Sequence, residues 1–117
     1  MITNALASVA ISDLARSVKW YQKLFDRPAD STPTPEVAEW KFERGGRLQV
    51  YQLKERAGVG SVTLEVSSLD DQIASLREIG IDPGDPMITE TVKVVMIKDP
   101  DGNSIAFAEA IDRSTAR

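Results

Sequence analysis

The chain has 117 residues, which suffices for one domain that buries roughly 65% of its extended surface on folding. It contains no cysteine and no histidine, so disulfides, thiolate metal sites, imidazole ligands and histidine-based catalytic triads are all excluded. The net charge is -4 and the lysines and arginines are scattered along the chain, so we expect no nucleic-acid partner.

The N-terminal segment does not resemble a targeting signal. Its apolar residues are interrupted by Thr3 and Asn4 and are not preceded by basic residues, unlike those of a signal peptide. Nothing in the sequence approaches the roughly 20 apolar residues that cross a membrane. We therefore expect a cytoplasmic protein without membrane contact.

The first half of the chain predicts a strand, a helix and a hairpin. Residues Leu6 to Ser12 alternate well enough for a strand, and Asp13 then begins a helix whose apolar stripe comprises Leu14, Val18, Tyr21, Leu24 and Phe25. The stretch from Arg27 to Pro35 leaves room for at most a short edge strand. Two further strands, Val37 to Glu43 and Arg47 to Leu53, flank a turn at Gly45-Gly46.

The same order recurs 55 positions later, where Leu69 takes the place of Leu14. Ser61 to Ser67 predict a strand, and a helix with Leu69, Ile73, Leu76 and Ile79 on one stripe ends at Gly80. After an irregular stretch from Gly80 to Pro86, the strands Val92 to Lys98 and Ser104 to Glu109 flank Asp99-Pro100-Asp101-Gly102-Asn103. The repeat predicts an α+β fold in which one domain holds two βαβββ modules, residues 1–55 and 60–110, joined by a linker at 54–60 and followed by a tail at 111–117.

These elements resemble a known family. The run Asp13-Leu14-Ala15-Arg16-Ser17 with Trp20-Tyr21 and Leu24-Phe25, followed by Asp99-Pro100-Asp101-Gly102-Asn103, is similar to the vicinal oxygen chelate superfamily of glyoxalase I, bleomycin-resistance proteins and extradiol dioxygenases. The resemblance covers essentially the whole chain. It implies curved mixed sheets that enclose a cavity, helices on the outside, and a homodimer formed through an exposed hairpin or edge strand.

The resemblance also implies where a metal would be bound. Metal-binding members carry His or Glu at four cavity-facing positions, which correspond in this sequence to Leu6, Gln49, Ser61 and Ala106. Of these, only Gln49 offers an oxygen suited to coordination, and affinity requires several charged or imidazole ligands. We therefore expect no metal and no other cofactor. The Lewis-acid chemistry of the family is correspondingly disfavoured in this chain.

Strand alternation predicts which side chains line the cavity. Val9 and Ile11 should face the helix, which leaves Leu6 and Ser8 on the concave side. A two-residue turn at Gly45-Gly46 would pair Trp40 with Tyr51 and Phe42 with Gln49, whereas an odd-length turn would reverse that facing. The expected ligand-binding residues are Leu6, Ser8, Trp40, Gln49, Tyr51, Ser61, Thr63, Glu65 and Ala106.

Several of these residues have an ordinary structural interpretation as well. Glu65 is a weak candidate for a catalytic base and could equally be a solvated or ion-paired carboxylate. Trp40 and Tyr51 could stack on an aromatic ligand or fill the core, whereas Trp20 and Tyr21 are expected to pack. The Asp, Asp and Asn of residues 99–103 predict a turn rather than a calcium loop, because the loop's glycine and glutamate positions do not match.

Two functions from different classes follow from this sequence. The first is a metal-independent protein that binds and sequesters a small organic ligand, aromatic or cationic. The alternative is an enzyme of lyase, isomerase or dioxygenase type that uses acid-base residues such as Glu65 and Tyr51, or a metal held between subunits. A partner-binding module with an empty cavity is a third possibility.

Overall fold

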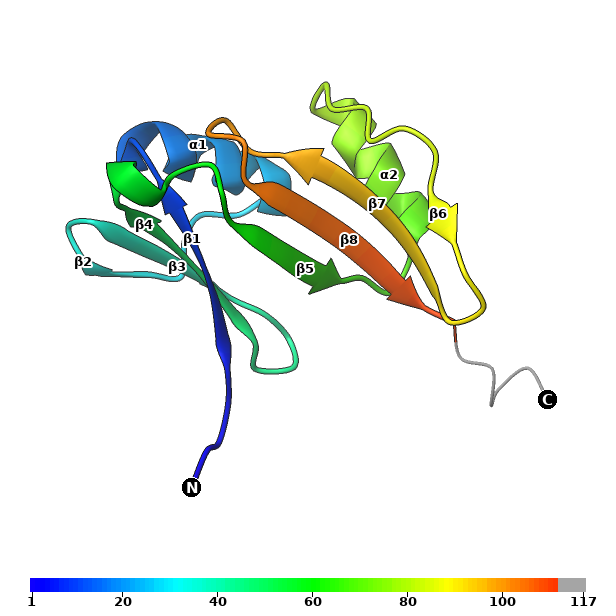
Figure 1. Cartoon of the computed structure of the whole chain (residues 1–117), viewed down its shortest axis with the longest axis horizontal. Helices are drawn as coiled ribbons and strands as arrows, with labels where there is room; N and C mark the ends of the chain where they lie inside the picture. Colours follow the sequence, from blue (N-terminus) through cyan, green and yellow to red (C-terminus); the bar gives the residue numbers. More distant parts are fainter. Residues whose placement is uncertain (112–117) are drawn as a thin grey trace. The chain divides into compact units, whose positions relative to one another are not determined.

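The computed structural model describes residues 1–111 and contains two four-stranded sheets, each accompanied by a helix (Figure 1). The chain divides into two compact units: residues 1–62 with 98–104, and residues 63–97 with the chain from Ile105 onward. The structure confirms the α+β class and the repeated βαβββ order. The elements are β1 (Leu6–Ile11), α1 (Leu14–Phe25), β2 (Ser31–Thr34), β3 (Val37–Lys41), β4 (Arg47–Gln52), a 3-10 turn η1 (Lys54–Arg56), β5 (Ser61–Glu65), α2 (Leu69–Glu78), β6 (Met87–Ile88), β7 (Val92–Lys98) and β8 (Ser104–Ala110).

The first sheet has the strand order β1-β4-β3-β2. β1 runs parallel to β4, and β3 pairs antiparallel with β4 and with β2. The parallel pair is possible because α1 provides the crossover between β1 and the hairpin. Asp13 begins α1 as expected, since its carboxylate accepts a hydrogen bond from the backbone nitrogen of Arg16 at 3.2 Å.

An aromatic cluster fills the space between α1 and the first sheet. Tyr21 and Phe25 of α1 lie 6.0 and 5.5 Å, centroid to centroid, from the ring of Trp40 on β3. The Trp40 indole nitrogen donates to the carbonyl oxygen of Arg27 at 3.1 Å, so its one polar group is satisfied although the side chain is buried. Trp20 meets Tyr21 edge-on at 4.8 Å, which confirms that both helix aromatics pack.

The turn at 99–103 is part of the first unit although it joins β7 to β8. Asn103 is fully buried, and its side chain accepts from the Gly60 nitrogen and donates to the Ala10 carbonyl oxygen, both at 2.8 Å. Asp99 accepts from the Tyr21 hydroxyl at 2.8 Å. Burial together with this carboxylate raises the pKa of Tyr21 well above its usual value. The motif therefore holds strand, helix and linker of the first unit together.

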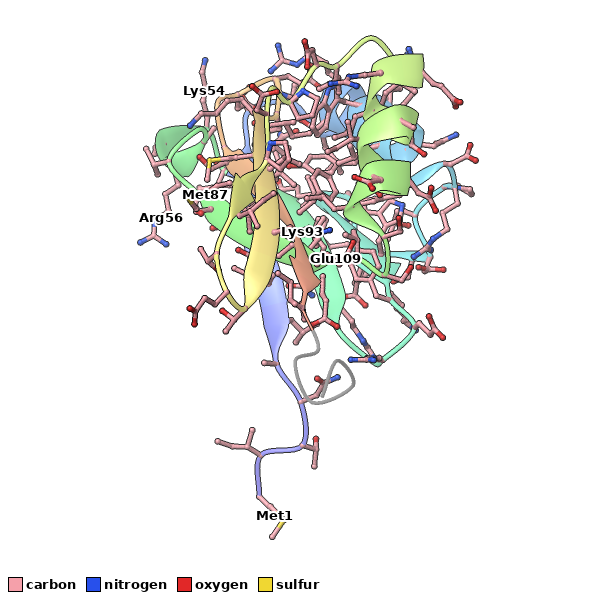
Figure 2. The ribbon with its side chains drawn as sticks, turned by 90° about the vertical axis from the view of Figure 1, so that its right-hand side faces the viewer. Met1, Lys54, Arg56, Met87, Lys93 and Glu109 are labelled. Atoms are coloured by element: carbon pink, nitrogen blue, oxygen red, sulfur yellow. The ribbon has the colours of Figure 1, made fainter. Side chains whose placement is uncertain are left out.

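The second sheet has the strand order β5-β8-β7-β6. Its helix α2 begins after Ser68, whose hydroxyl accepts from the backbone nitrogen of Asp71 at 3.2 Å. The helix buries Leu69, Ile73 and Leu76 of the predicted stripe, whereas Ile79 lies just after the helix and is 39% exposed. Figure 2 shows α2 along one side of these strands, with side chains filling the space between helix and sheet. Among the residues that the structure describes, no helix is long and apolar enough to cross a membrane.

The first hairpin differs from its expected register. Phe42 and Gly46 bond through backbone atoms at 2.8 Å, and Gly45 has a positive φ of 96°, which leaves three residues in the turn. Trp40 consequently lies opposite Leu48, and Glu39 lies opposite Gln49. The predicted pairs Trp40 with Tyr51 and Phe42 with Gln49 are therefore wrong, because an odd-length turn changes which side chains share a face. Residues 112–117 of the expected tail lie outside the described part of the chain.

Candidate functional site

The first sheet presents a polar row on the side away from α1. The register aligns Ser8 of β1 with Gln49 of β4, and Gln49 with Glu39 of β3. Residues that lie directly opposite one another point to the same side of a sheet, and alternate residues along a strand share that side. We call this side the first-sheet face; it comprises Leu6, Ser8, Ala10, Val37, Glu39, Lys41, Arg47, Gln49 and Tyr51.

Glu39 is the centre of a hydrogen-bonded chain on the first-sheet face. Its Oε1 accepts from Arg47 Nη1 at 3.1 Å and its Oε2 accepts from Gln49 Nε2 at 2.8 Å. The Ser8 hydroxyl in turn lies 3.4 Å from Gln49 Oε1. The Glu39 side chain is 5% exposed, whereas that of Arg47 is 42% exposed. A buried carboxylate is thus stabilised by one cation and one amide.

Glu39 and Arg47 were not predicted as site residues. A two-residue turn would put Glu39, like Lys41 and Glu43, on the helix side, because these residues alternate with Trp40 and Phe42. The signal that could have found it lies in β3 itself, because Ala38, Trp40 and Phe42 form an apolar alternation whose burial leaves Glu39 on the opposite side. The hairpin register, rather than any motif, therefore determines the composition of this face.

Trp40 is a predicted ligand residue that the structure places on the helix side of its sheet. It is fully buried on the α1 side among Tyr21 and Phe25. Phe42 is likewise on that side, where its ring centroid lies 5.5 Å from that of Phe25. The aromatic wall expected from the hairpin is therefore core, and Tyr51, which is half-buried, is the aromatic residue that remains on the first-sheet face.

The side of the second sheet away from α2 carries apolar side chains from β6 and β7. Val95 and Ile97 of β7 are buried, and Glu109 of β8 accepts from the backbone nitrogen of Leu69 at 2.7 Å, at the start of α2. Odd-numbered residues of β7 and β8 thus face the helix, and even-numbered ones face away. In Figure 2, Lys93 and Glu109 lie on the α2 side of the strands and Met87 on the other side.

We call this second surface the second-sheet face. Met87 lies opposite Val94 in the antiparallel register, so the two side chains share it. Met87 and Met96 are 63% and 51% exposed, although methionine is an apolar residue. Met87, Val94 and Met96 were not predicted as ligand-binding residues, because the alternating residues of β7 had not been assigned to a side of the sheet. The face comprises Thr63, Glu65, Met87, Val94, Met96, Ala106 and Ala108.

The remaining predicted residues are placed as follows. Leu6 and Ser8 are exposed on β1, and Gln49 is half-buried on β4. Ser61, Thr63 and Glu65 are exposed on β5, where Val62 is buried on the alternate side. Ala106 is only 7% exposed. With the exception of Trp40, the predicted ligand residues therefore lie on the strand faces away from the helices.

A separate hollow of about 320 Å³ lies beside α2. None of the predicted site residues lines it. Its walls come from Asp70, Ile73, Ala74, Arg77, Gly84, Asp85 and Pro86. It lies between α2 and the loop that contains residues 84–86, and we assign no chemistry to it.

Comparison with solved structures identifies the family. The chain is 32% identical to a glyoxalase/bleomycin resistance protein from Catenulispora acidiphila, with a TM-score of 0.81 over 91% of this chain and 96% of that one. The chain belongs to the glyoxalase/bleomycin resistance protein family. This confirms the predicted vicinal oxygen chelate resemblance. No protein-family model and no curated protein matched the sequence.

Two further family folds are similar at lower identity. A lactoylglutathione lyase from Agrobacterium tumefaciens is 17% identical, with a TM-score of 0.76 over 92% of each chain. The antibiotic-binding protein TnmS3 from a Streptomyces species is 21% identical, with a TM-score of 0.79 over 94% of this chain and 98% of that one. At these identities the likeness concerns the fold alone.

The residues at the family's metal positions do not fit a divalent metal. Leu6 and Ala106 carry no ligand atom, and Ser61 offers a neutral hydroxyl. Gln49 directs its amide nitrogen to Glu39, which leaves one neutral carbonyl oxygen, too weak a ligand to hold a divalent ion without charged partners. Within residues 1–111, no three acidic, His or Cys side chains are grouped so that they could hold a metal ion. No reaction step is therefore derived through a metal.

Proposed function

We propose that this family member binds a small organic molecule without a metal ion and acts by holding it. The ligand would lie against the strand faces that point away from the helices. The observation that carries the proposal is the composition of the family's four metal positions, Leu6, Gln49, Ser61 and Ala106, which supply one carboxamide and no charged ligand.

The second-sheet face supports ligand binding by its chemistry. Exposed methionines are flexible and polarizable, and they are favoured on surfaces that accept ligands of varied shape. Met87 and Met96 lie more than half exposed beside Val94. An exposed apolar surface of this kind has a free-energy cost in water, which contact with an apolar ligand relieves.

The comparisons agree with a binding function. One similar structure is an antibiotic-binding protein, and another is a bleomycin resistance determinant encoded on transposon Tn5. These titles describe those proteins. They support the proposal for this chain only in that the same fold, with helices on one side of each sheet, serves to hold an organic molecule.

Two measurements test the proposal. The purified full chain is analysed for bound metal, and its melting temperature is measured against a library of aromatic and heterocyclic compounds. We expect substoichiometric metal and at least one compound that stabilises the protein; at 100 times Kd the gain is about 2.7 kcal/mol. Stoichiometric nickel, zinc, iron or manganese would overturn the proposal.

A matched pair of variants locates the binding surface. Met87 and Ile88 are adjacent on β6 and equally exposed at 63%, but they point to opposite sides of the strand. M87E should weaken binding of a stabilising compound at least tenfold, because it places a charge on the second-sheet face. I88E should leave binding unchanged. Equal effects of the two substitutions would show that the ligand lies elsewhere.

The homodimer expected from the resemblance is part of this proposal. Its expected contacts are end strands of the two sheets such as β2 and β6, each of which pairs with one strand only in the described chain. Size-exclusion chromatography with light scattering distinguishes a dimer from a 12.8 kDa monomer. A monomer at all concentrations would refute the proposed homodimer without affecting the proposal of ligand binding.

A further inference from the structure

The hydrogen-bonded chain on the first-sheet face fixes the orientation of an amide. Glu39 is a carboxylate and can only accept hydrogen bonds when ionised. Its Oε2 lies 2.8 Å from Gln49 Nε2, so the amide nitrogen of Gln49 is turned toward it. A reversed amide would place the Gln49 carbonyl oxygen against the carboxylate, and two acceptors would then face each other. Glu39 therefore determines which end of Gln49 is presented.

The opposite end of the amide is the one accessible to a ligand. Glu39 is buried, Gln49 is half-buried and Ser8 is exposed, so exposure increases from the carboxylate toward β1. Gln49 Oε1 lies on that exposed side, where its contact with the Ser8 hydroxyl is long at 3.4 Å. A carbonyl oxygen has two lone pairs and can accept a second, shorter hydrogen bond.

The charges on this face do not favour a cation, because Lys41 lies on it together with the ion pair of Arg47 and Glu39. The Arg47 guanidinium lies 3.1 Å from Glu39 Oε1, so the carboxylate already has a cationic partner. A second cation would have to compete with this partner and enter a buried position. An uncharged donor that approaches Gln49 Oε1 leaves the ion pair intact. The first-sheet face thus favours a neutral donor over the cationic ligand considered from composition.

We propose that Glu39 is a positioning residue that makes Gln49 an obligate hydrogen-bond acceptor, so that the protein selects neutral organic ligands carrying an O–H or N–H donor. This inference rests on the proposed binding function and names the ligand class. The ring of Tyr51, two residues from Gln49 on the same strand face, would contact the apolar part of such a ligand.

The test compares probe molecules that differ only in the donor. The pairs are 2-naphthol with 2-methoxynaphthalene and indole with 1-methylindole, each titrated into the full chain by NMR. We expect the donor-bearing member of each pair to bind about 2- to 10-fold more tightly, the range for one net hydrogen bond. Equal affinities within both pairs would overturn the inference while leaving the binding function standing, whereas no binding of any probe would overturn both.

Variants separate positioning from a merely structural role. E39Q keeps the shape of the side chain but can also donate a hydrogen bond, so the Gln49 amide is free to turn. The ratio of the affinities of the donor-bearing and methylated probes should then fall toward one. A merely structural Glu39 would weaken both members of a pair equally and leave their ratio unchanged. E36Q removes one negative charge at an exposed position and should preserve the ratio.

Two further readouts keep the inference falsifiable if E39Q does not fold. Q49L should abolish the donor preference and retain binding of the methylated probes; a preference that survives in Q49L would refute the role of Gln49. In the wild-type protein, the Gln49 side-chain amide protons should be shifted by their carboxylate partner and should move less on binding of 2-naphthol than neighbouring resonances. Large shifts of these protons would indicate that the ligand contacts the amide nitrogen instead.

Discussion

Asn103 provides the sharpest test of what holds the first unit together. N103A removes three side-chain hydrogen bonds, to the Gly60 nitrogen, the Ala10 carbonyl oxygen and Asp99 Oδ2, each 2.8 Å long. Asp99 keeps its bond from the Tyr21 hydroxyl, but the groups on Gly60 and Ala10 lose a buried partner. Each such loss costs about 1–3 kcal/mol, so we expect the two together to destabilise the protein by about 2–6 kcal/mol. That is a large part of a typical stability of about 5–15 kcal/mol.

Urea denaturation followed by tryptophan fluorescence measures this loss. The control is N4A, since Asn4 also makes a long-range hydrogen bond, to the Gly45 carbonyl oxygen at 2.6 Å, but does so in an exposed position. N4A should cost less than about 1 kcal/mol. If N103A costs no more than N4A at an unchanged m-value, the buried network is not what holds the turn in place.

N103D refines the same test, because it keeps the shape and the oxygen that accepts from Gly60. The new carboxylate oxygen would face Asp99 Oδ2 and the Ala10 carbonyl oxygen at the positions where the amide now donates. Two carboxylates in contact raise the pKa of one of them in the folded state. The penalty should therefore be largest at neutral pH and diminish as the pH falls. A penalty independent of pH would contradict this account.

Two further predictions concern the same unit. The pKa of Tyr21 is raised in the folded state, so above the ordinary value of 10.0 the unfolded chain releases a proton that the native protein keeps, and stability should fall by up to about 1.4 kcal/mol per pH unit. Urea titrations between pH 8 and 11 should show this slope in wild type and Y51F but not in Y21F. Gly58 and Gly84 both have positive φ, but an added Cβ would lie 2.3 Å from a backbone oxygen of the turn only at Gly58. G58A should therefore cost at least 2 kcal/mol more than G84A, roughly the energy of a buried backbone clash; equal melting temperatures would contradict it.

Most of the fold could be predicted because the sequence contains its pattern twice. The match of Leu14 with Leu69, each directly after a capping residue, located both helices, and β7 has the predicted bounds of Val92–Lys98. Two copies of one βαβββ order restrict the arrangement more strongly than either copy alone, since each strand must find an equivalent partner. Strand ends were less predictable: β3 ends at Lys41, two residues before the expected end, because the turn begins earlier.

The candidate site was less predictable because it depends on the parity of one hairpin. The pair Gly45-Gly46 is a typical two-residue turn in sequence, and its interpretation as such placed Trp40 and Phe42 beside the ligand. The actual turn uses Gly45 alone in a positive-φ conformation, with Gly46 paired to Phe42. Local turn preferences cannot distinguish a two-residue turn from a three-residue turn here, because a glycine pair is compatible with either. A shift by an odd number of residues moves every side chain of β3 to the other face.

The magnitudes indicate which signal should have decided the register. Burying a tryptophan removes about 150–250 Å² from water, worth about 4–6 kcal/mol at 25 cal/mol per Å², whereas the conformational freedom of a glycine is worth about 1 kcal/mol. The alternative register would also place Lys41 and Glu43 beneath α1, at a cost of several kcal/mol for each unpaired charge. Side-chain burial along the strand therefore outweighs the turn residues. The same alternation that buries Trp40 brings Glu39 beside Gln49, so the register that completes the core also determines which hydrogen-bonding group the first-sheet face can offer.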